Sequence, residues 1–367
     1  MQAQALQEDD SLLQASENFS VLRLRKKVLN DRSFIGLMAT HRQKTGTFNS
    51  ALGIDGVIHL PKQHVFIGSI SSTLDQSQLR SYNWIDNSRL SLIISKRKES
   101  GLSYNGAYEY SGQGYNPAMG FLLRGRHHNF YTAVNYGIFR NTREEGRFSY
   151  QRWRLVNSDI YFRPDFSEVI TWYNRSSWQG TFFTGDKISF FGQMQHESLQ
   201  SPIQYSSRLK AEPGAYFFPF GGISYSPAVQ RVLQATFSAE YGGFFAGRRL
   251  KLELSPEINL SKHLNINFSW EANHIRFPDA QDWIHILNLK LNWAANIHLS
   301  GGAIAQYNSI SERLFFSGRI RYNVRDGHDI YLAFNQMHAT EQRGWGQSLS
   351  DFENQTLAVK YIYTFMR

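Results

Sequence analysis

The stretch LNINFSW, Leu264–Trp270, alternates apolar and polar side chains without a break. Its first, third, fifth and seventh residues are apolar, whereas Asn265, Asn267 and Ser269 between them are polar. Successive side chains of a β-strand point to opposite faces of the sheet. The stretch therefore predicts a strand with one apolar face and one polar face.

The same alternation extends outward from this stretch to both ends of the chain. It recurs at Leu22–Lys27, Leu250–Leu254 (LKLEL), Leu314–Tyr322 and Leu357–Phe365. The alternating segments are commonly longer than the roughly 5 to 6 residues typical of soluble strands. They approach the roughly 9 to 11 residues with which a tilted strand crosses a bilayer.

Composition favours strands whose two faces meet different solvents. Aromatic residues make up 15% of the 367 residues, yet the mean hydropathy is −0.43. No stretch approaches the roughly 18 consecutive apolar residues of a spanning helix, which excludes a helical membrane protein. Averaging a lipid-facing side with a water-facing side gives such a composition. A soluble all-β protein rich in tyrosine is the alternative.

Several aromatic residues are expected near strand ends, where a membrane interface would place them. They are Trp270, Trp283, Trp293, Tyr307, Tyr331 and Tyr363.

The connections between the segments fall into two classes. Short ones with turn chemistry are Asn30–Arg32, Pro61–Gln63, Glu99–Gly101, Arg163–Asp165, Ser261–His263 and Arg325–Gly327. Long ones rich in Gly, Ser, Gln and Asn are Leu74–Asn87, Gln113–Gly120, Ser198–Glu212 and Glu341–Gln355. Short periplasmic turns alternate with longer outer loops in bacterial barrels. The sequence therefore predicts an all-β, transmembrane, antiparallel up-and-down β-barrel of roughly 16 to 20 strands.

No linker or composition shift divides the chain. Residues 1–18 are expected to be an amino-terminal loop or the remnant of an upstream strand, and residues 19–367 to form the barrel. If the short turns are periplasmic, the first alternating segment runs inward and the chain begins on the outer side. This parity predicts at least one further strand upstream.

Five stretches resemble an uncharacterised family of outer-membrane barrels that is common in Bacteroidota. They are NFSVLRLRKK (Asn18–Lys27), SFIGLMATHR (Ser33–Arg42), NPAMGFLLR (Asn116–Arg124), RIRYNVRDGHDIYLAFNQ (Arg319–Gln336) and VKYIYTF (Val359–Phe365). Members of that family usually carry an amino-terminal domain similar to family-nine carbohydrate-binding modules. The resemblance implies a role in glycan handling, but the domain that would bind a sugar is absent here.

No catalytic, cofactor or metal site is predicted from the residues. The chain has no cysteine, and the adjacent His127 and His128 must point to opposite faces of a strand, so they cannot share a metal ion. Glu240, Glu253 and Glu271 are expected on the polar face as solvated charges rather than as an acid and base pair. Abundant Ser and His carry no local signature of a nucleophile.

Charged side chains that alternate with apolar ones are expected to line the lumen, because a Lys or Arg at the lipid midplane costs about 2 to 4 kcal/mol. These candidates are Arg23, Arg25, Lys27, Lys251, Glu253, Glu271, Arg319, Arg321 and Lys360. One interpretation is a positively lined pore that favours anionic solutes. The other is that the cations pair with lumen carboxylates or lie near the rim.

Three functions remain open at this point, all in the bacterial outer membrane. The first is a non-enzymatic pore or membrane anchor of an envelope protein linked to glycan handling. The second is a cell-surface hydrolase of polysaccharide or lipid, and the third is a structural partner in an envelope complex. The expected partners are outer-membrane lipid and anionic or glycan solutes, and protein partners stay undefined. The net charge of +9 is spread along the chain, which does not favour nucleic-acid binding.

Overall fold

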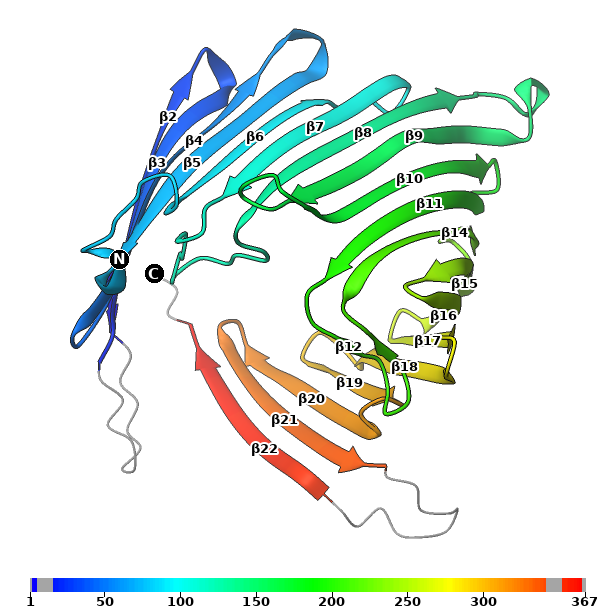
Figure 1. Ribbon diagram of the computed structural model, residues 1–367. Coiled ribbons are helices and arrows are strands. Elements are labelled where there is room, and N and C mark those ends of the chain that lie inside the picture. Colours follow the sequence, from blue (N-terminus) through cyan, green and yellow to red (C-terminus); the bar gives the residue numbers. More distant parts are fainter. Residues whose placement is uncertain (1, 5–15, 341–351, 365–367) are drawn as a thin grey trace. The chain divides into compact units, whose positions relative to one another are not determined.

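The computed structural model describes residues 2–4, 16–340 and 352–364, and strands dominate these residues (Figure 1). The long strands have 9 to 15 residues. They are β2 (Asn18–Val28), β3 (Asn30–Lys44), β4 (Thr47–His59), β5 (His64–Asp75), β6 (Ser88–Lys96), β7 (Gly101–Ser111), β8 (His127–Phe139), β9 (Phe148–Phe162), β10 (Val169–Phe182), β11 (Lys187–Leu199), β14 (Gly214–Ser226), β15 (Leu233–Phe244), β16 (Gly247–Ser261), β17 (Leu264–Arg276), β18 (Gln281–Ala294), β19 (Leu299–Asn308), β20 (Arg313–Arg325), β21 (His328–Ala339) and β22 (Phe352–Tyr363).

The prediction of an all-β, antiparallel up-and-down fold is confirmed. In the part of the chain that the structure describes, one sheet has 20 strands, which lies within the predicted range, and the short strands β12 (Ile203–Gln204) and β13 (Lys210–Ala211) pair separately. The only helices among the described residues are the single turns η1 (Pro61–Gln63), η2 (Gln76–Gln78) and η3 (Arg143–Glu145). None of the described helices has the length and apolarity to cross a membrane.

The chain divides into two compact units. Unit 1 comprises Met1–Phe139, Arg152–Ser176 and Met194–Ser198, and unit 2 comprises Arg140–Gln151, Ser177–Gln193 and Leu199–Arg367. The predicted boundary at residue 18 stays a prediction. Within the predicted amino-terminal segment, β1 (Gln2–Gln4) pairs antiparallel with the first three residues of β2.

Cross-strand pairing in unit 1 separates two faces. One ladder runs Leu24, Leu37, Ile54, Ile70, Leu90 across β2 to β6. The adjacent ladder runs Arg25, Gly36, Asp55, Ser69, Ser91, Glu109, Asn129 across β2 to β8. Because directly paired residues project from the same side of a sheet, we name these sides the hydrophobic face and the polar face.

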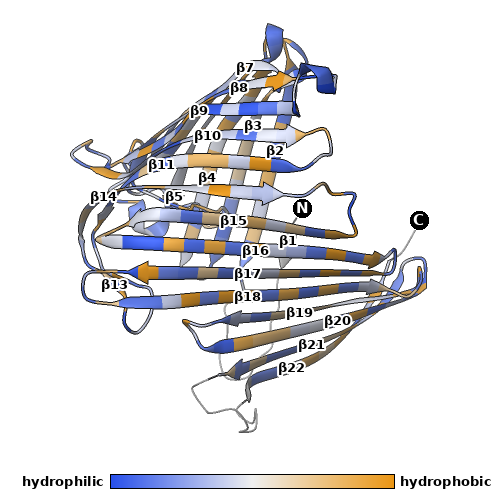
Figure 2. Cartoon of the chain, turned by 90° about the vertical axis from the view of Figure 1, so that its right-hand side faces the viewer, coloured by the Kyte–Doolittle hydropathy of each residue, from blue (hydrophilic) through white to orange (hydrophobic). Residues whose placement is uncertain are grey.

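Unit 2 repeats this separation, and the alternation is visible along β15 to β18 in Figure 2. Its hydrophobic face includes Ile258, Ile266, Leu291, Ala303, Gly318, Phe334 and Leu357 in one ladder. Its polar face includes Gln234, Glu257, Asn267, Lys290, Ile304, Ser317, Asn335 and Thr356 in another.

One of the aromatic predictions is wrong, and a second aromatic residue lies near a strand end but on the polar face. Tyr331 pairs with Arg321 and Lys360 and therefore lies on the polar face. Trp270 lies in the middle of β17 rather than near its end. A single aromatic residue at an alternating position indicates a face only when its neighbours on the adjacent strands are known.

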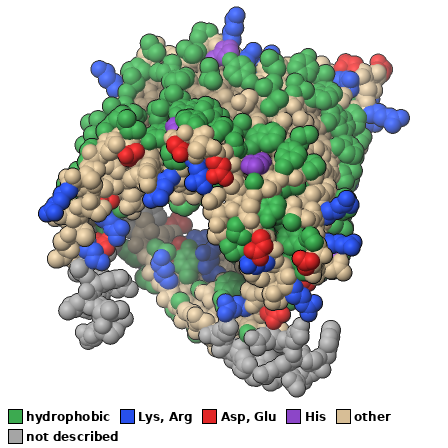
Figure 3. All heavy atoms as spheres, in the orientation of Figure 1, with side chains coloured by type: hydrophobic (Ala, Val, Ile, Leu, Met, Phe, Trp, Pro, Cys, Tyr) green, Lys and Arg blue, Asp and Glu red, His purple; other side chains and the backbone are tan. Residues whose placement is uncertain are grey.

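The hydrophobic face is largely uncovered. Leu24 is 57% exposed, Leu52 is 56% exposed and Ile54 is 52% exposed. Figure 3 shows hydrophobic side chains over broad areas of the visible surface. Several of the most buried side chains are instead polar residues of the polar face, such as Thr73 and Ser111. The apolar strand faces therefore do not pack against one another as in a soluble sandwich.

A small hydrophobic core occurs in unit 2, where the β12–β13 hairpin covers part of the polar face. Leu209 is fully buried against Phe244, Ile275, Phe277 and Ile284. Ser206 fixes the hairpin by donating a 2.8 Å hydrogen bond to Asp282. The predicted long connection Ser198–Glu212 is thus an ordered segment rather than an open loop.

The connections of unit 1 differ between the two ends of its strands. The connections at residue 29, at 60–63 and at 97–100 are short, and we call this the turn end. The other end carries 76–87 and 112–126, and we call it the loop end. The loop end also carries the two-residue connection between β3 and β4, so the predicted alternation of short and long connections fails there and holds from β4 to β8.

The assignment of Arg163–Asp165 to the short-turn side is wrong. This connection lies beside the first residues of β8, because His128 Nε2 is 3.1 Å from the carbonyl oxygen of Pro164 and His128 stacks on Phe166. It therefore belongs to the loop end. Of the predicted long connection Glu341–Gln355, residues 341–351 lie outside the described residues. The remaining residues belong to β22, which begins at Phe352.

Candidate functional site

The polar face of unit 1 carries the three amino-terminal candidates. Arg23 donates to both carboxylate oxygens of Asp55, with 2.7 Å between Nη2 and Oδ2. The Arg25 guanidinium lies 3.6 Å from the centre of the Phe34 ring. Lys27 lies at the turn end, 3.7 Å from Asp31, and both side chains are exposed. Only Arg23 is therefore part of a well-formed ion pair.

Lys251, Glu253 and Glu271 are brought together on the polar face of unit 2. The Lys251 ammonium is 2.5 Å from Glu253 Oε1 and 3.3 Å from Glu271 Oε2. Ser238 donates a further hydrogen bond to Glu253. The charge of Lys251 is therefore compensated by two carboxylates, which supports the interpretation that some lumen cations pair with lumen carboxylates.

Arg319, Arg321 and Lys360 gather around Tyr331. Arg321 is fixed by Asp329, with 2.8 Å between Nη2 and Oδ1. The Arg319 guanidinium lies 5.7 Å from the centre of the Tyr331 ring, and Lys360 pairs with Tyr331 across the strands. No described carboxylate forms an ion pair with Arg319 or Lys360. These cations keep their charge available.

A buried network in unit 1 was not predicted. Arg89 on β6 is 2.6 Å from Glu109 on β7, and Glu109 is 3.3 Å from Nε2 of His127 on β8. The His127 side chain is only 2% exposed. His128 stacks on Phe166, and the prediction that the two histidine side chains point to opposite faces is confirmed.

The connection from 112 to 126 crosses the polar face of unit 1. Its first half passes over β6 and β5 and reaches β4, where the buried Asn49 donates to the carbonyl oxygen of Asn116 and accepts from the amide of Ala118. Thr73 on β5 accepts from the amide of Asn116. The hydroxyl groups of Ser71 and Tyr115 are 2.9 Å apart. Four polar-face contacts therefore hold this segment.

The second half of this connection approaches β9 and β10. The Arg124 guanidinium lies 4.6 Å from the centre of the Tyr161 ring and donates to Thr171. Between the two attachments, Phe121 is 83% exposed and Leu123 is 86% exposed. We call residues 112–126 the crossing loop, because it is attached to strands on both sides of β7 and β8 and its apolar middle is uncovered.

Two glycines let the crossing loop leave β7 in this direction. A Cβ at Gly112 would lie 2.2 Å from the carbonyl oxygen of Asp86, and a Cβ at Gly114 would lie 2.0 Å from Oδ1 of Asn87. Any larger residue would push the loop away from the end of the connection between β5 and β6. The Gly-containing composition predicted a loop, but it did not predict on which face that loop lies.

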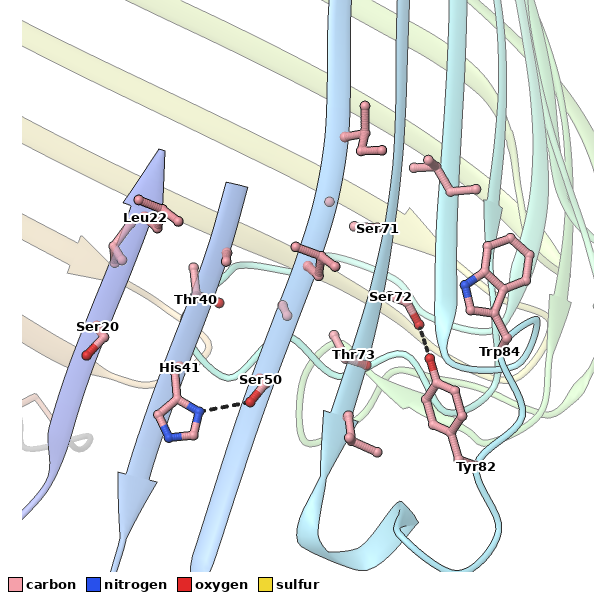
Figure 4. Close-up of a pocket in the computed structure, with 18 residues that line it drawn as sticks. Ser20, Leu22, Thr40, His41, Ser50, Ser71, Ser72, Thr73, Tyr82 and Trp84 are labelled. Atoms are coloured by element: carbon pink, nitrogen blue, oxygen red, sulfur yellow. Dashed lines mark hydrogen bonds between the residues drawn. The ribbon is translucent and has the colours of Figure 1, made fainter. Parts of the chain in front are cut away.

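Unlike the crossing loop, which lies on the polar face, the connection between β5 and β6 folds over the hydrophobic face. Tyr82 is bonded to Ser72 at 2.8 Å, and together with Trp84 it helps to line a groove of about 730 Å³ (Figure 4). Leu22, Leu52 and Ile54 belong to the same lining. This groove is therefore an apolar recess near the loop end of β2 to β5.

The groove contains one pair of reactive side-chain types. His41 on β3 and Ser50 on β4 are directly paired, and Nδ1 of His41 is 2.9 Å from Oγ of Ser50 (Figure 4). Ser20 continues the row on β2. A histidine that can accept a serine proton is one requirement of nucleophilic catalysis. This pair could not be predicted from the sequence, since the two residues are nine positions apart and neither belongs to a motif.

No metal centre emerges from the described residues, because no three of their His, Asp and Glu side chains converge on one point. The arrangement offers charged and polar groups on one face and an apolar groove on the other.

Comparison with known proteins gives little that bears on function. No protein-family model and no curated sequence matches the chain. Among solved structures, the chain is similar to one described as "Copper transporter OprC", with 9% sequence identity and a TM-score of 0.48. The alignment covers 89% of this chain and 67% of that chain.

Proposed function

We propose that this chain is an integral β-barrel protein of the bacterial outer membrane. The observation that carries the proposal is the uncovered hydrophobic face, on which residues such as Leu24, Leu52 and Ile54 are more than half exposed. In water, such an area would favour association or aggregation. In a bilayer, acyl chains would cover it, and the antiparallel ladders satisfy the backbone hydrogen-bonding groups between neighbouring strands.

We further propose that the polar face lines a water-filled passage that the crossing loop narrows. Charges such as Arg23, Asp55 and Lys251 are stable on this face only if water or a counter-charge meets them. If the passage is open, the protein functions as a pore. If the passage is closed, the protein functions as a membrane anchor. A link to glycan handling is supported only by the sequence resemblance and belongs to the same proposal.

The test is the conductance of the purified full chain in planar bilayers. We expect discrete steps for the wild type, and larger steps when residues 115–123 are replaced by a short Gly-Ser linker. Shortening the connection at 79–84, which keeps Gln78 and its hydrogen bond to the carbonyl oxygen of Gly114, is the matched control and should leave the step size unchanged. If neither the wild type nor the 115–123 variant conducts, the pore is refuted and the anchor remains.

A second candidate function rests on the His41–Ser50 pair. Its position in an apolar groove on the hydrophobic face would suit hydrolysis of a lipid ester, with Ser50 as the nucleophile and His41 as the base. This candidate ranks second because no described carboxylate or amide side chain contacts the other ring nitrogen of His41, as a complete triad would require.

The hydrolase candidate is tested with a fluorophosphonate probe on protein in lipid vesicles. It predicts labelling of the wild type, loss of labelling in Ser50→Ala, and retained labelling in Ser72→Ala, a change on the same face. Release of fatty acid from the vesicles should follow the labelling. An unlabelled wild-type protein refutes this candidate without affecting the pore.

A further inference from the structure

The polar face of unit 2 contains a recess on β18, β19 and β20 with an excess of positive charge. The recess has a volume of about 430 Å³, and Lys290, Arg319 and Arg321 contribute to its lining together with Ser300 and Ser317. We propose that it binds an oxyanion group, a phosphate or a carboxylate, of a solute in the passage. This inference rests on the proposed function, because the recess must face water.

Strand register explains why the recess is open. Gly302 on β19 pairs with Asn292 on one side and with Arg319 on the other. Because Gly302 has no side chain, no side chain of β19 lies between Asn292 and Arg319 at this position. An added Cβ would lie 3.2 Å from the carbonyl oxygen of Leu291. The space in front of Arg319 is therefore available to a ligand.

The charges around the recess do not cancel. Asp329 contacts Arg321 at 2.8 Å and is the one described carboxylate that forms an ion pair with a cation of the recess. Arg319 instead lies over Tyr331, and the cross-strand neighbours of Lys290 are Asn267 and Ile304. Two of the three cations therefore have no described counter-charge.

The contrast with Lys251 shows that this excess is specific to the recess. Lys251 lies on the polar face of the same unit, but Glu253 and Glu271 both contact it. An anion that reaches Lys251 must displace carboxylates, whereas an anion that reaches Lys290 and Arg319 displaces water. The free energy of binding is consequently more favourable at the recess.

The residue types suit an oxyanion. A guanidinium presents several N–H donors in one plane, an ammonium presents a compact charge, and both form strong hydrogen bonds to phosphate or carboxylate oxygens. The hydroxyl of Ser300 is a further donor at the recess. Because Lys290 and Arg319 are exposed, binding should be weak and rapidly reversible, as a passage for solutes requires.

The experiment is equilibrium dialysis of radiolabelled inorganic phosphate against the detergent-solubilised full chain at low salt. We expect saturable binding of phosphate by the wild type. The affinity for phosphate should fall about tenfold or more in the variant Lys290→Gln/Arg319→Gln, which removes two charge-assisted contacts. Lys262→Gln removes a charge of the same sign from the turn after β16 and is the matched control. The variant Lys290→Arg/Arg319→Lys keeps both charges and should retain binding.

Two outcomes overturn the inference. One is the absence of saturable binding to the wild type, and the other is equal binding by the wild type and the Lys290→Gln/Arg319→Gln variant. Measuring conductance as well distinguishes a failure of the anion-binding recess from a failure of the proposed pore. Phosphate binding without conductance refutes the pore and leaves the recess. Conductance with unchanged anion selectivity in the double variant, together with absent binding, refutes the recess and leaves the pore.

Discussion

Asn49 holds a distant backbone segment through both ends of its carboxamide. Its amide group donates to the carbonyl oxygen of Asn116 at 2.8 Å, and its oxygen accepts from the amide of Ala118 at 3.2 Å. No apolar side chain could replace this contact, because both partners are backbone groups. A single residue of β4 therefore supplies two of the four polar-face contacts that hold the crossing loop.

We expect Asn49→Ala to release the first half of the crossing loop. Each lost hydrogen bond contributes about 0.5 to 1.5 kcal/mol, which is enough to open the loop without unfolding the strands. Hydrogen exchange at residues 114–118 should become at least tenfold faster, and the midpoint of thermal unfolding should change little. Asn335→Ala, which removes a polar-face hydrogen bond far from the loop in sequence, should leave the exchange at 114–118 unchanged.

Asp186 stabilises the turn between β10 and β11. Hydrogen bonds from Thr184 and from the amide of Ala228, together with Arg231, lower the pKa of its carboxyl group below the ordinary 3.8. A lowered native pKa means that the carboxylate stabilises the fold above the unfolded-state value. This contribution is lost as the pH falls through the native pKa.

The pH dependence of unfolding tests this role. The difference in thermal midpoint between the wild type and Asp186→Asn should be constant above about pH 5 and should shrink below about pH 4. A difference that persists unchanged at the lowest pH at which the protein stays folded would show that the charge of Asp186 does not contribute.

At the level of the strand, alternation gives neighbouring residues opposite surroundings. Leu92 lies at the centre of β6 on the hydrophobic face and is 37% exposed. Ser91, one position earlier, pairs with Ser69 and with Glu109 on the polar face. The two positions differ in the solvent that each side chain meets, although strand, depth and backbone geometry are nearly the same.

Lysine substitutions at these two positions should therefore have opposite consequences. Leu92→Lys places a charge against acyl chains and should reduce the free energy of unfolding in bilayers by about 2 to 4 kcal/mol. Ser91→Lys places the same charge next to Glu109 and should cost less than about 1 kcal/mol. Urea unfolding in lipid vesicles measures both values, and equal costs would contradict the assignment of the faces.

At the scale of the whole molecule, exposed apolar side chains dominate the energetics. Only a small cluster around Leu209 forms a hydrophobic core among the described residues, while large residues of the hydrophobic face remain uncovered in both units. If the chain is the proposed membrane protein, the hydrophobic contribution to its stability comes from lipid rather than from the interior. Stability should depend on the presence of a bilayer.

We expect the urea-unfolded chain to gain β-structure when it is diluted into phospholipid vesicles and to aggregate when it is diluted into buffer alone. Far-ultraviolet circular dichroism and protection from protease distinguish these results. A monodisperse, folded protein in buffer without lipid or detergent would refute the membrane assignment.

The sequence alone determined the class of fold and the two faces. A period of two residues has a direct structural meaning. LNINFSW and the other alternating segments therefore predicted the strands, their polar and apolar faces, and the approximate number of strands. Paired ladders place charged candidates such as Arg23, Lys251 and Arg319 on the polar face of their units. Alternation requires no knowledge of the neighbouring strands.

Only the tertiary structure decided which charges are neutralised and where the long connections lie. Lys251 meets two carboxylates and Lys290 meets none, although both are lysines at polar positions of alternating strands. The connections at 76–87 and 112–126 have similar compositions but fold over opposite faces. Register and long-range hydrogen bonds set these outcomes, and both depend on residues that are distant in the sequence.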